Sequence, residues 1–223
     1  MSALNHDVSM WAIIPAAGLG RRMGRAKQAL PYGDSTLTGT VAGCILNAGV
    51  DGVAIVTRAA LIRDLDLPDD ARIQIALNED TESDMIDSIR IGLTTIADAT
   101  TTRKCNESMT LSVGVLVVPG DMPTLSAKTC RDCMQAFEAD PSRIVIATHG
   151  QRRGHPIVFP FALRSAVDQL TGGLNELPRQ HADRVHLVEI TDPAVTQDVN
   201  TPEEYEDLLS QDSRDKTLPE DAA

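Results

Sequence analysis

A loop with three glycines and four cations follows an apolar run near the amino end of the sequence. The apolar run is residues 11–14, and the loop that follows, residues 15–27, is written PAAGLGRRMGRAK. Glycines let backbone N–H groups approach an anion closely, and cations add attraction, so the loop fits a triphosphate. Composition alone also allows a flexible basic loop. The residues concerned are Gly18, Gly20 and Gly24, with Arg21, Arg22, Arg25 and Lys27.

The spacing in this loop matches neither common phosphate-binding motif. The dinucleotide motif requires G-x-G-x-x-G, whereas this sequence has G-x-G-x-x-x-G from Gly18 to Gly24. The P-loop requires Gly-Lys-Ser/Thr, whereas Lys27 follows an alanine. The loop therefore indicates phosphate chemistry without identifying the phosphate.

Oxygen-bearing side chains follow two other apolar runs. Asp121 comes after the most apolar run, residues 113–118, and Asp198 and Asn200 follow the last one. Mg²⁺ is commonly held by one or two carboxylates together with substrate phosphates, so the three side chains suggest a metal clamp. Taken singly, Asp121 also fits a turn, and Asp198 or Asn200 also fits the entry to a helix.

Apolar runs and helical patterns alternate through the first two thirds of the chain. Runs that are apolar on both faces suit strands covered on both sides, as in a parallel sheet. The order predicts an α/β fold with a doubly wound, mostly parallel, Rossmann-like sheet and ligands beyond the carboxyl ends of its strands. The predicted strands are 11–14, 53–56, 73–76, 113–118 and 143–147, and the predicted helices 35–48, 84–96 and 126–139, with Ser35 and Ser126 as N-caps.

The alternation weakens after Gly150. We expect a turn at 149–154, a strand at 156–159 and a helix from Pro160 to Leu170, which together add a small hairpin and lid. A last strand is expected at 185–190, and Thr201 is expected to cap a final helix.

We expect one domain, because 223 residues with 42% hydrophobic content can form a single well-buried core. Its predicted extent is 1–209, with a nucleotide-binding half at 11–148 and an acceptor-binding, closing half at 149–209. Residues 210–223 are expected to form a disordered acidic tail.

The composition excludes some classes of function. A formal charge of −12 would repel nucleic acid and anionic membranes, so neither is an expected partner. The first residues lack the pattern of a secretion signal, and a cytoplasmic location is expected. Cys130 and Cys133 form a single C-x-x-C without a second pair, which favours buried helix thiols over a metal site.

Four motifs in order resemble the molybdenum cofactor nucleotidyltransferases, most closely their cytidylyltransferase branch. The signature AAG-x-G-x-R-M-G-x-x-K matches residues 16–27 at every specified position, and the resemblance spans roughly residues 11–209. The other motifs are GDMP at 120–123, RGHP at 153–156 and DVNTPE at 198–203.

The resemblance implies a role for each matching residue. Nucleotide would be bound by Ala16, Ala17, Gly18, Gly20, Arg22, Lys27, Asn78, Ser88 and Asp121. Lys27, Arg22 and Asp121 would be catalytic, and Mg²⁺ would be held by Asp121, Asn200 and Asp198. Arg153, His155 and Arg179 would bind the acceptor; without the family, a loop histidine beside proline such as His155 is more often structural.

The chain departs from the family pattern at two places. Asp84 replaces a glycine in the N-x5-G-M-x-x-S motif, which brings a negative charge toward the nucleotide. The G-D-x-G-A-R motif is altered in the segment 172–180, where Arg179 follows Pro178 and stands two residues beyond the expected arginine.

The resemblance also implies substrates and partners. AAG at residues 16–18 is typical of the branch that uses CTP, and the acceptor would be molybdopterin, with a molybdoenzyme or chaperone as a transient partner. The alternatives are another phosphorylated acceptor such as a sugar or alcohol phosphate, a GTP-using guanylyltransferase, or a non-catalytic nucleotide-binding module for cofactor delivery.

Overall fold

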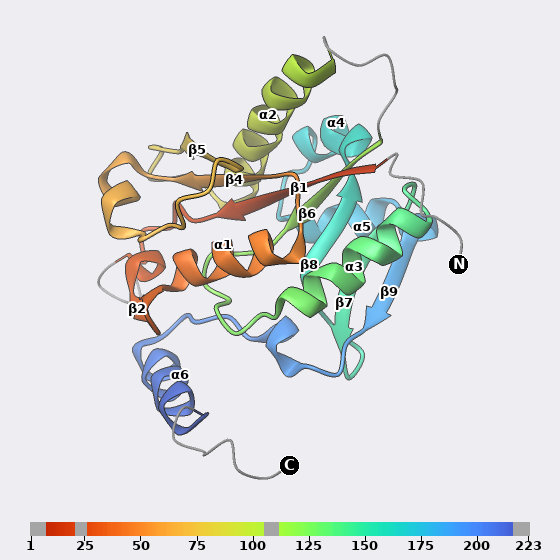
Figure 1. The fold of residues 1–223 in the computed structure, drawn as a ribbon. Helices are drawn as coiled ribbons and strands as arrows, with labels where there is room; N and C mark the ends of the chain where they lie inside the picture. The colour runs from red at the N-terminus through yellow and green to blue at the C-terminus, as the bar shows by residue number, and fades with distance from the viewer. Residues whose placement is uncertain (1–7, 21–25, 105–111, 216–223) are drawn as a thin grey trace.

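A seven-stranded sheet forms the centre of the computed structural model, which describes residues 8–20, 26–104 and 112–215 (Figure 1). The strand order is β5-β4-β1-β6-β8-β7-β9. Neighbouring strands are parallel except at β8, which is antiparallel to both β6 and β7. The strands are β1 Val8–Pro15, β4 Gly52–Thr57, β5 Ile73–Leu77, β6 Ser112–Val117, β7 Ile144–His149, β8 Arg152–Pro160 and β9 Val185–Glu189.

Helices cover both faces of this sheet (Figure 1). α1 (Leu37–Ala48) and α3 (Ala127–Ala139) pack on one face, and α2 (Met85–Lys104) and α4 (Arg164–Asp168) on the other. The predicted mostly parallel α/β sheet is therefore confirmed. The remaining elements are the short pair β2 Pro31–Tyr32 and β3 Ser35–Thr36, the helices α5 Leu177–Gln180 and α6 Pro202–Asp215, and the 3-10 turns η2 Lys27–Ala29, η3 Ala59–Asp64, η4 Phe161–Leu163, η5 Leu174–Glu176, η6 Ala182–Arg184 and η7 Pro193–Thr196.

The central strands supply both halves of the core. Along β1, Ala12 and Ile14 belong to the cluster with α1 and α3, whereas Trp11 and Ile13 belong to the cluster with α2 and α4. Successive side chains of a strand point to opposite faces, so a strand covered on both sides must be apolar throughout. The unbroken apolar runs in the sequence follow from this requirement.

One predicted helix cap is confirmed and one is wrong. Ser126 caps α3 by accepting a 3.1 Å hydrogen bond from the Thr129 N–H. At α1 the cap is Thr36, whose hydroxyl accepts from the Gly39 N–H at 3.1 Å. Ser35 instead belongs to β3 and donates to the Asp66 carbonyl at 2.9 Å. Because Ser35 belongs to β3, α1 begins only at Leu37, with Thr36 as its cap.

The second half differs from the sequence prediction at two helices. Pro160 does not open a helix: it ends β8, and the following segment is η4 and then α4, which stops at Asp168. At the other end, α6 continues to Asp215, so residues 210–215 are helical where a disordered tail was expected. The predicted cap of α6 is confirmed, since Thr201 accepts from the Glu204 N–H and Glu204 accepts from the Thr201 N–H.

The cysteines of α3 lie in the core. Cys130 and Cys133 are fully buried, and burial raises the pKa of the Cys133 thiol to about 12. Cys44 on α1 is half-buried and donates to the Leu125 carbonyl at 2.9 Å, and Cys105 lies outside the described residues. In the described part of the chain, no helix is long and apolar enough to cross a membrane.

We predict that Cys133 is inert in the native protein because the thiolate is the reactive form and its pKa is about 12. Iodoacetamide at about pH 8 should leave Cys133 unmodified before unfolding and modify it afterwards, as measured by peptide mass mapping. Cys44, whose pKa is lowered by a hydrogen bond from Cys130, should react faster than Cys133. Equal native rates at Cys44 and Cys133 would contradict the prediction.

A second prediction concerns Gly154, where β8 passes close to η7. An alanine Cβ at this position would lie 1.9 Å from the Val195 carbonyl oxygen, which as a backbone atom cannot rotate away. Gly154→Ala should lower the free energy of unfolding by about 2 kcal/mol in urea titrations.

The matched control is Gly173→Ala. Gly173 has φ −77° and no atom within 4 Å of an added Cβ, so its substitution should change stability by less than about 0.5 kcal/mol. Similar losses at both glycines would show that the close approach of β8 and η7 is not the cause.

Candidate active site

The glycine loop leaves the sheet at the carboxyl end of β1. The Ala16 N–H donates to the Val56 carbonyl at 2.7 Å, and the Thr57 hydroxyl donates to the Ala16 carbonyl at 3.2 Å. The loop is thereby anchored to β4 before it turns at Gly20, whose φ of 59° is the left-handed conformation that favours glycine. Arg22, predicted from the signature to bind phosphate, lies outside the described residues.

A cavity of about 470 Å³ lies beside this loop, between the carboxyl end of β6 and the start of α2. Six of the residues predicted to bind nucleotide line it: Ala17, Gly18, Gly20, Lys27, Ser88 and Asp121. Ala16 is fully buried beneath the loop, and Asn78 is buried behind Ser88, to which its side-chain amide donates at 3.0 Å. The volume suits a nucleotide.

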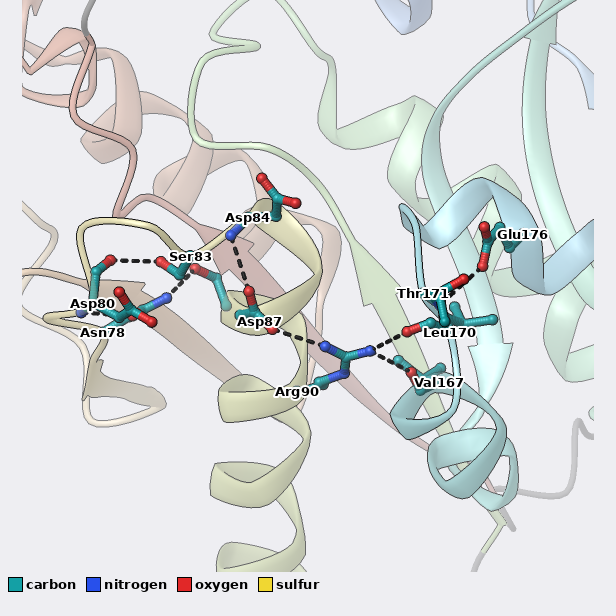
Figure 2. Close-up of polar contacts among 11 residues, drawn as sticks. Asn78, Asp80, Ser83, Asp84, Asp87, Arg90, Val167, Leu170, Thr171 and Glu176 are labelled. Carbon is teal, nitrogen blue, oxygen red and sulfur yellow. Dashed lines mark hydrogen bonds and ion pairs between the residues drawn. The ribbon is translucent and has the colours of Figure 1, made fainter.

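Hydrogen bonds at the start of α2 shape one wall of this cavity (Figure 2). The Asp84 N–H donates to Asp87 Oδ2 at 2.9 Å, and Asp87 Oδ1 accepts from Arg90 at 2.7 Å. The Asp84 side chain is exposed, lines the cavity and points away from Asp87 in Figure 2. Its backbone N–H thus serves the helix start, while its carboxylate adds negative charge at the cavity wall.

Arg90 connects the start of α2 to the segment that follows α4 (Figure 2). Its Nη2 donates to the Leu170 carbonyl at 2.5 Å and more weakly to the Val167 carbonyl at 3.4 Å. Glu176 accepts from the Thr171 N–H at 3.2 Å in the same segment. The start of α2, which lines the first cavity, is therefore tied through Arg90 to the residues directly before the altered segment 172–180.

Three loops meet at the Lys27 ammonium. Lys27 Nζ forms an ion pair with Asp121 Oδ2 and donates to the Val199 carbonyl and to Asn200 Oδ1, each at 3.0 Å. Asn200 in turn donates to Asp198 Oδ2 at 2.8 Å. The structure therefore brings Lys27, Asp121, Asn200 and Asp198 together, as the metal-clamp hypothesis requires.

The oxygen atoms around Lys27 Nζ are those that a hard cation prefers. A carboxylate, a backbone carbonyl and an amide oxygen converge on one point, and Asp121 Oδ1 is buried without a hydrogen-bond partner. Buried polar atoms are seldom left unsatisfied without a functional reason. Within the described residues, no group of three or more His, Cys, Asp or Glu side chains could hold a metal, so a metal here would take further ligands from phosphate or water.

A second cavity of about 250 Å³ adjoins the first. Arg153, His155 and Asp198 line it, and Met85, Pro119 and Asp121 line both cavities. Asp121 therefore stands at the boundary between a space lined by the glycine loop and a space lined by the RGHP segment.

His155 faces this second cavity from β8. Burial lowers the pKa of His155, although a hydrogen bond to the Val117 carbonyl and the negative charges of Asp121 and Asp198 oppose the effect. Since an unperturbed histidine has a pKa of about 6.5, His155 is neutral near pH 7. A neutral ring can both donate and accept a hydrogen bond.

Some residues lie elsewhere than expected, and others were missed by the sequence analysis. Arg179 is exposed on α5 and lines neither cavity, whereas Asn175 from the same segment lines the second. Arg58, which lines the first cavity, and Arg152, which lines the second, were not predicted. The available signal for Arg58 was its position two residues after the apolar run 53–56, where a parallel sheet places ligands.

The seven-stranded α/β sheet, with adjoining cavities at the carboxyl ends of its parallel strands, has the fold of nucleotidyltransferases. Residues 12–185 match the MobA-like NTP transferase domain, and the chain belongs to this family. Members of the family typically use a divalent metal, and the domain implies an NTP and a phosphorylated acceptor as substrates. No curated protein sequence matches the chain significantly.

Solved structures share the fold. Rv0371c from Mycobacterium tuberculosis H37Rv superposes with a TM-score of 0.73 at 24% identity, over 94% of this chain and 100% of that one. A nucleotidyl transferase from Methanothermobacter thermautotrophicus gives 0.71 at 19% identity, over 93% and 99%. A 4-diphosphocytidyl-2C-methyl-D-erythritol synthase from Anaerococcus prevotii gives 0.70 at 16%, over 93% and 97%. A further structure of Rv0371c is a complex with manganese.

We predict that Lys27→Met destabilises the protein because the Asp121 side chain, only 9% exposed, would lose its cation. The free energy of unfolding should fall by about 3 kcal/mol in urea titrations. Added Mg²⁺ should restore more stability to the variant than to the wild type, since it would compensate the same carboxylate.

The control is Lys128→Met, which breaks an ion pair to Asp132 whose lysine is 76% exposed. An exposed pair contributes little, so its loss should cost less than about 1 kcal/mol, with no added response to Mg²⁺. The same loss and the same Mg²⁺ response in both variants would contradict the interpretation of the Lys27 cluster.

Proposed function

We propose that the protein transfers CMP from CTP to the phosphate of molybdopterin and releases pyrophosphate. The observation that carries this proposal is the place of Asp121, which lines both cavities and contacts Lys27, the last residue of the glycine-loop signature. The NTP would occupy the first cavity and the acceptor the second. The acceptor phosphate and the α-phosphorus would then meet beside Asp121.

The protein's own residues would act mainly by positioning and by neutralising charge. The glycine loop would bind the triphosphate, and Lys27 would turn from Asp121 toward the phosphates and offset the negative charge that develops as pyrophosphate leaves. The acceptor phosphate itself attacks in line, so no side-chain nucleophile is required. His155, Arg153 and the unpredicted Arg152 would orient the acceptor from the second cavity.

Asp121, Asn200 and Asp198 would hold Mg²⁺ in this proposal. The fit rests on the oxygen atoms gathered around Lys27 Nζ and on the unpartnered Asp121 Oδ1. When bound, Mg²⁺ would polarise phosphate oxygens and neutralise their charge.

Two observations support alternatives. Arg179 stands outside the second cavity, which weakens the case for molybdopterin and favours another phosphorylated acceptor such as a sugar or alcohol phosphate. The Asp84 carboxylate at the wall of the first cavity favours a non-catalytic binding module or a different nucleotide, including GTP. The joint presence of Lys27, Asp121 and Asn200 supports catalysis, because a simple binder has no need for a metal clamp.

The test is a matrix of reactions in which pyrophosphate is measured for CTP, GTP, ATP and UTP with Mg²⁺ and either molybdopterin or a set of sugar and alcohol phosphates. Release with CTP and molybdopterin alone supports the full proposal. Release with another pair corrects the substrates, and nucleotide binding without release under any condition overturns the transferase assignment.

We predict that Asp121→Ala abolishes turnover, because it removes the carboxylate at the boundary of the two cavities. The loss of pyrophosphate release should reach at least about a thousandfold, while circular dichroism shows a folded protein. Asp69→Ala, which alters an exposed aspartate between η3 and β5, should leave turnover unchanged. Wild-type turnover in the Asp121 variant would remove Asp121 from the mechanism.

A further inference from the structure

Arg58 is a buried arginine that follows β4 and lines the first cavity. Its three side-chain nitrogens each donate to a backbone carbonyl. Nε donates to Ala17 at 2.8 Å, Nη1 to Glu79 at 3.0 Å and Nη2 to Asp80 at 2.8 Å. One side chain therefore joins the glycine loop to the turn that leads into α2.

The positive charge of Arg58 is not matched by an acid. Among the described residues, no carboxylate lies within ion-pair distance of it, and the neighbouring Glu79 carboxylate instead accepts from the Ala59 N–H at 2.7 Å. Carbonyl dipoles offset a guanidinium charge only in part. An arginine in this state adds positive potential to the cavity it lines, in a protein whose formal charge is −12.

The contact with Ala17 also determines the direction of a peptide group. The Ala17 carbonyl and the Gly18 N–H belong to one trans peptide, so they point in opposite directions. When Arg58 holds the carbonyl, the Gly18 N–H is fixed as well. Arg58 thus orients a backbone donor of the loop without contacting the ligand of that donor.

The contacts with Glu79 and Asp80 fix the opposite wall. Residues 81–85, which follow this turn, line the cavity across from the glycine loop. Because one planar guanidinium binds both segments, the distance between the two walls depends on its geometry. Lysine carries the same charge but cannot bind three carbonyls in one plane.

We propose that Arg58 is a nucleotide-positioning residue: it sets the separation of the two cavity walls, orients the Gly18 N–H and leaves its positive charge for the triphosphate. This inference rests on the proposed function, since the anion it serves is the NTP. It assigns to Arg58 an effect on nucleotide binding rather than on the chemical step, because the residues beside Asp121 are untouched.

The test compares Arg58→Lys, which keeps the charge, with Arg58→Met, which removes it, in the full-length protein. Isothermal titration with CTP and Mg²⁺ should give an affinity about tenfold weaker for Arg58→Lys, since hydrogen bonds to a charged group are lost, and weaker still for Arg58→Met. The KM for nucleotide should rise in parallel. The kcat at saturating nucleotide and the KM for the acceptor should change less than about threefold.

The control is Arg63→Met, an exposed arginine on η3 close in sequence to Arg58. It should bind CTP as the wild type does. Wild-type affinity in both Arg58 variants, or equal rises in both KM values, would overturn the inference while leaving the transferase in place. A wild type that binds no NTP would instead overturn the proposed function.

A measurement on the wild type covers the case in which the Arg58 variants do not fold. In hydrogen–deuterium exchange, residues 16–20 and 79–83 should both gain protection when CTP and Mg²⁺ are added, because one side chain joins them. Protection of only one of these segments would overturn the inference.

Discussion

The ion pair between Lys27 and Asp121 is the constraint on which the architecture of the site depends. Lys27 also donates to Val199 and Asn200, and the Val199 N–H donates to the Asp121 carbonyl, so three distant parts of the sequence must reach one point. Adjacent parallel strands β1 and β6 bring the first two there, because their carboxyl ends share an edge of the sheet. The third arrives by way of η7, which packs against β8 through the close approach at Gly154.

The sequence predicted the parts of the fold whose physics is local. The central strands were predicted because strands covered on both faces must be apolar throughout. Asp121, Asp198 and Asn200 were proposed together because each follows an apolar run, and the family resemblance added Lys27. Features that depend on contacts between residues distant in the sequence were not predicted. Ser35 and Thr36 are both good capping residues, and only the β2–β3 pair decides between them. Arg58 carries only a positional signal in the sequence, its place just after an apolar run, because its partners are carbonyl groups, which every residue possesses.

The two cavities differ in how many hydrogen bonds fix the segments that line them. The first is enclosed by anchored segments: the glycine loop is bound to β4, Asn78 is bonded to Ser88, and Arg58 bridges the walls. The second is lined by the exposed Arg152 and Arg153 and by Asn175, an exposed residue of the altered segment 172–180. A first cavity whose walls are bonded together suits a ligand common to the whole family, whereas a second cavity lined by exposed side chains suits a ligand that varies from one member to another.

The reversed direction of β8 explains how the second cavity, the proposed acceptor site, can change while the first cavity, the proposed NTP site, stays the same. β8 runs antiparallel to β6, so its first residues lie beside the carboxyl end of β6 without any helix crossing the sheet. The proposed acceptor cavity therefore takes Arg152, Arg153 and His155 from this hairpin and Asn175 from a following segment, all separate in sequence from the glycine loop. Exposed residues of this hairpin can change without touching the Lys27 cluster, whereas Gly154 cannot, because it packs on η7, which leads to Asp198 and Asn200. Substitutions at Arg152, Arg153 and Asn175, which are all exposed, would then change what the second cavity accepts while the glycine loop and its anchors stay as they are.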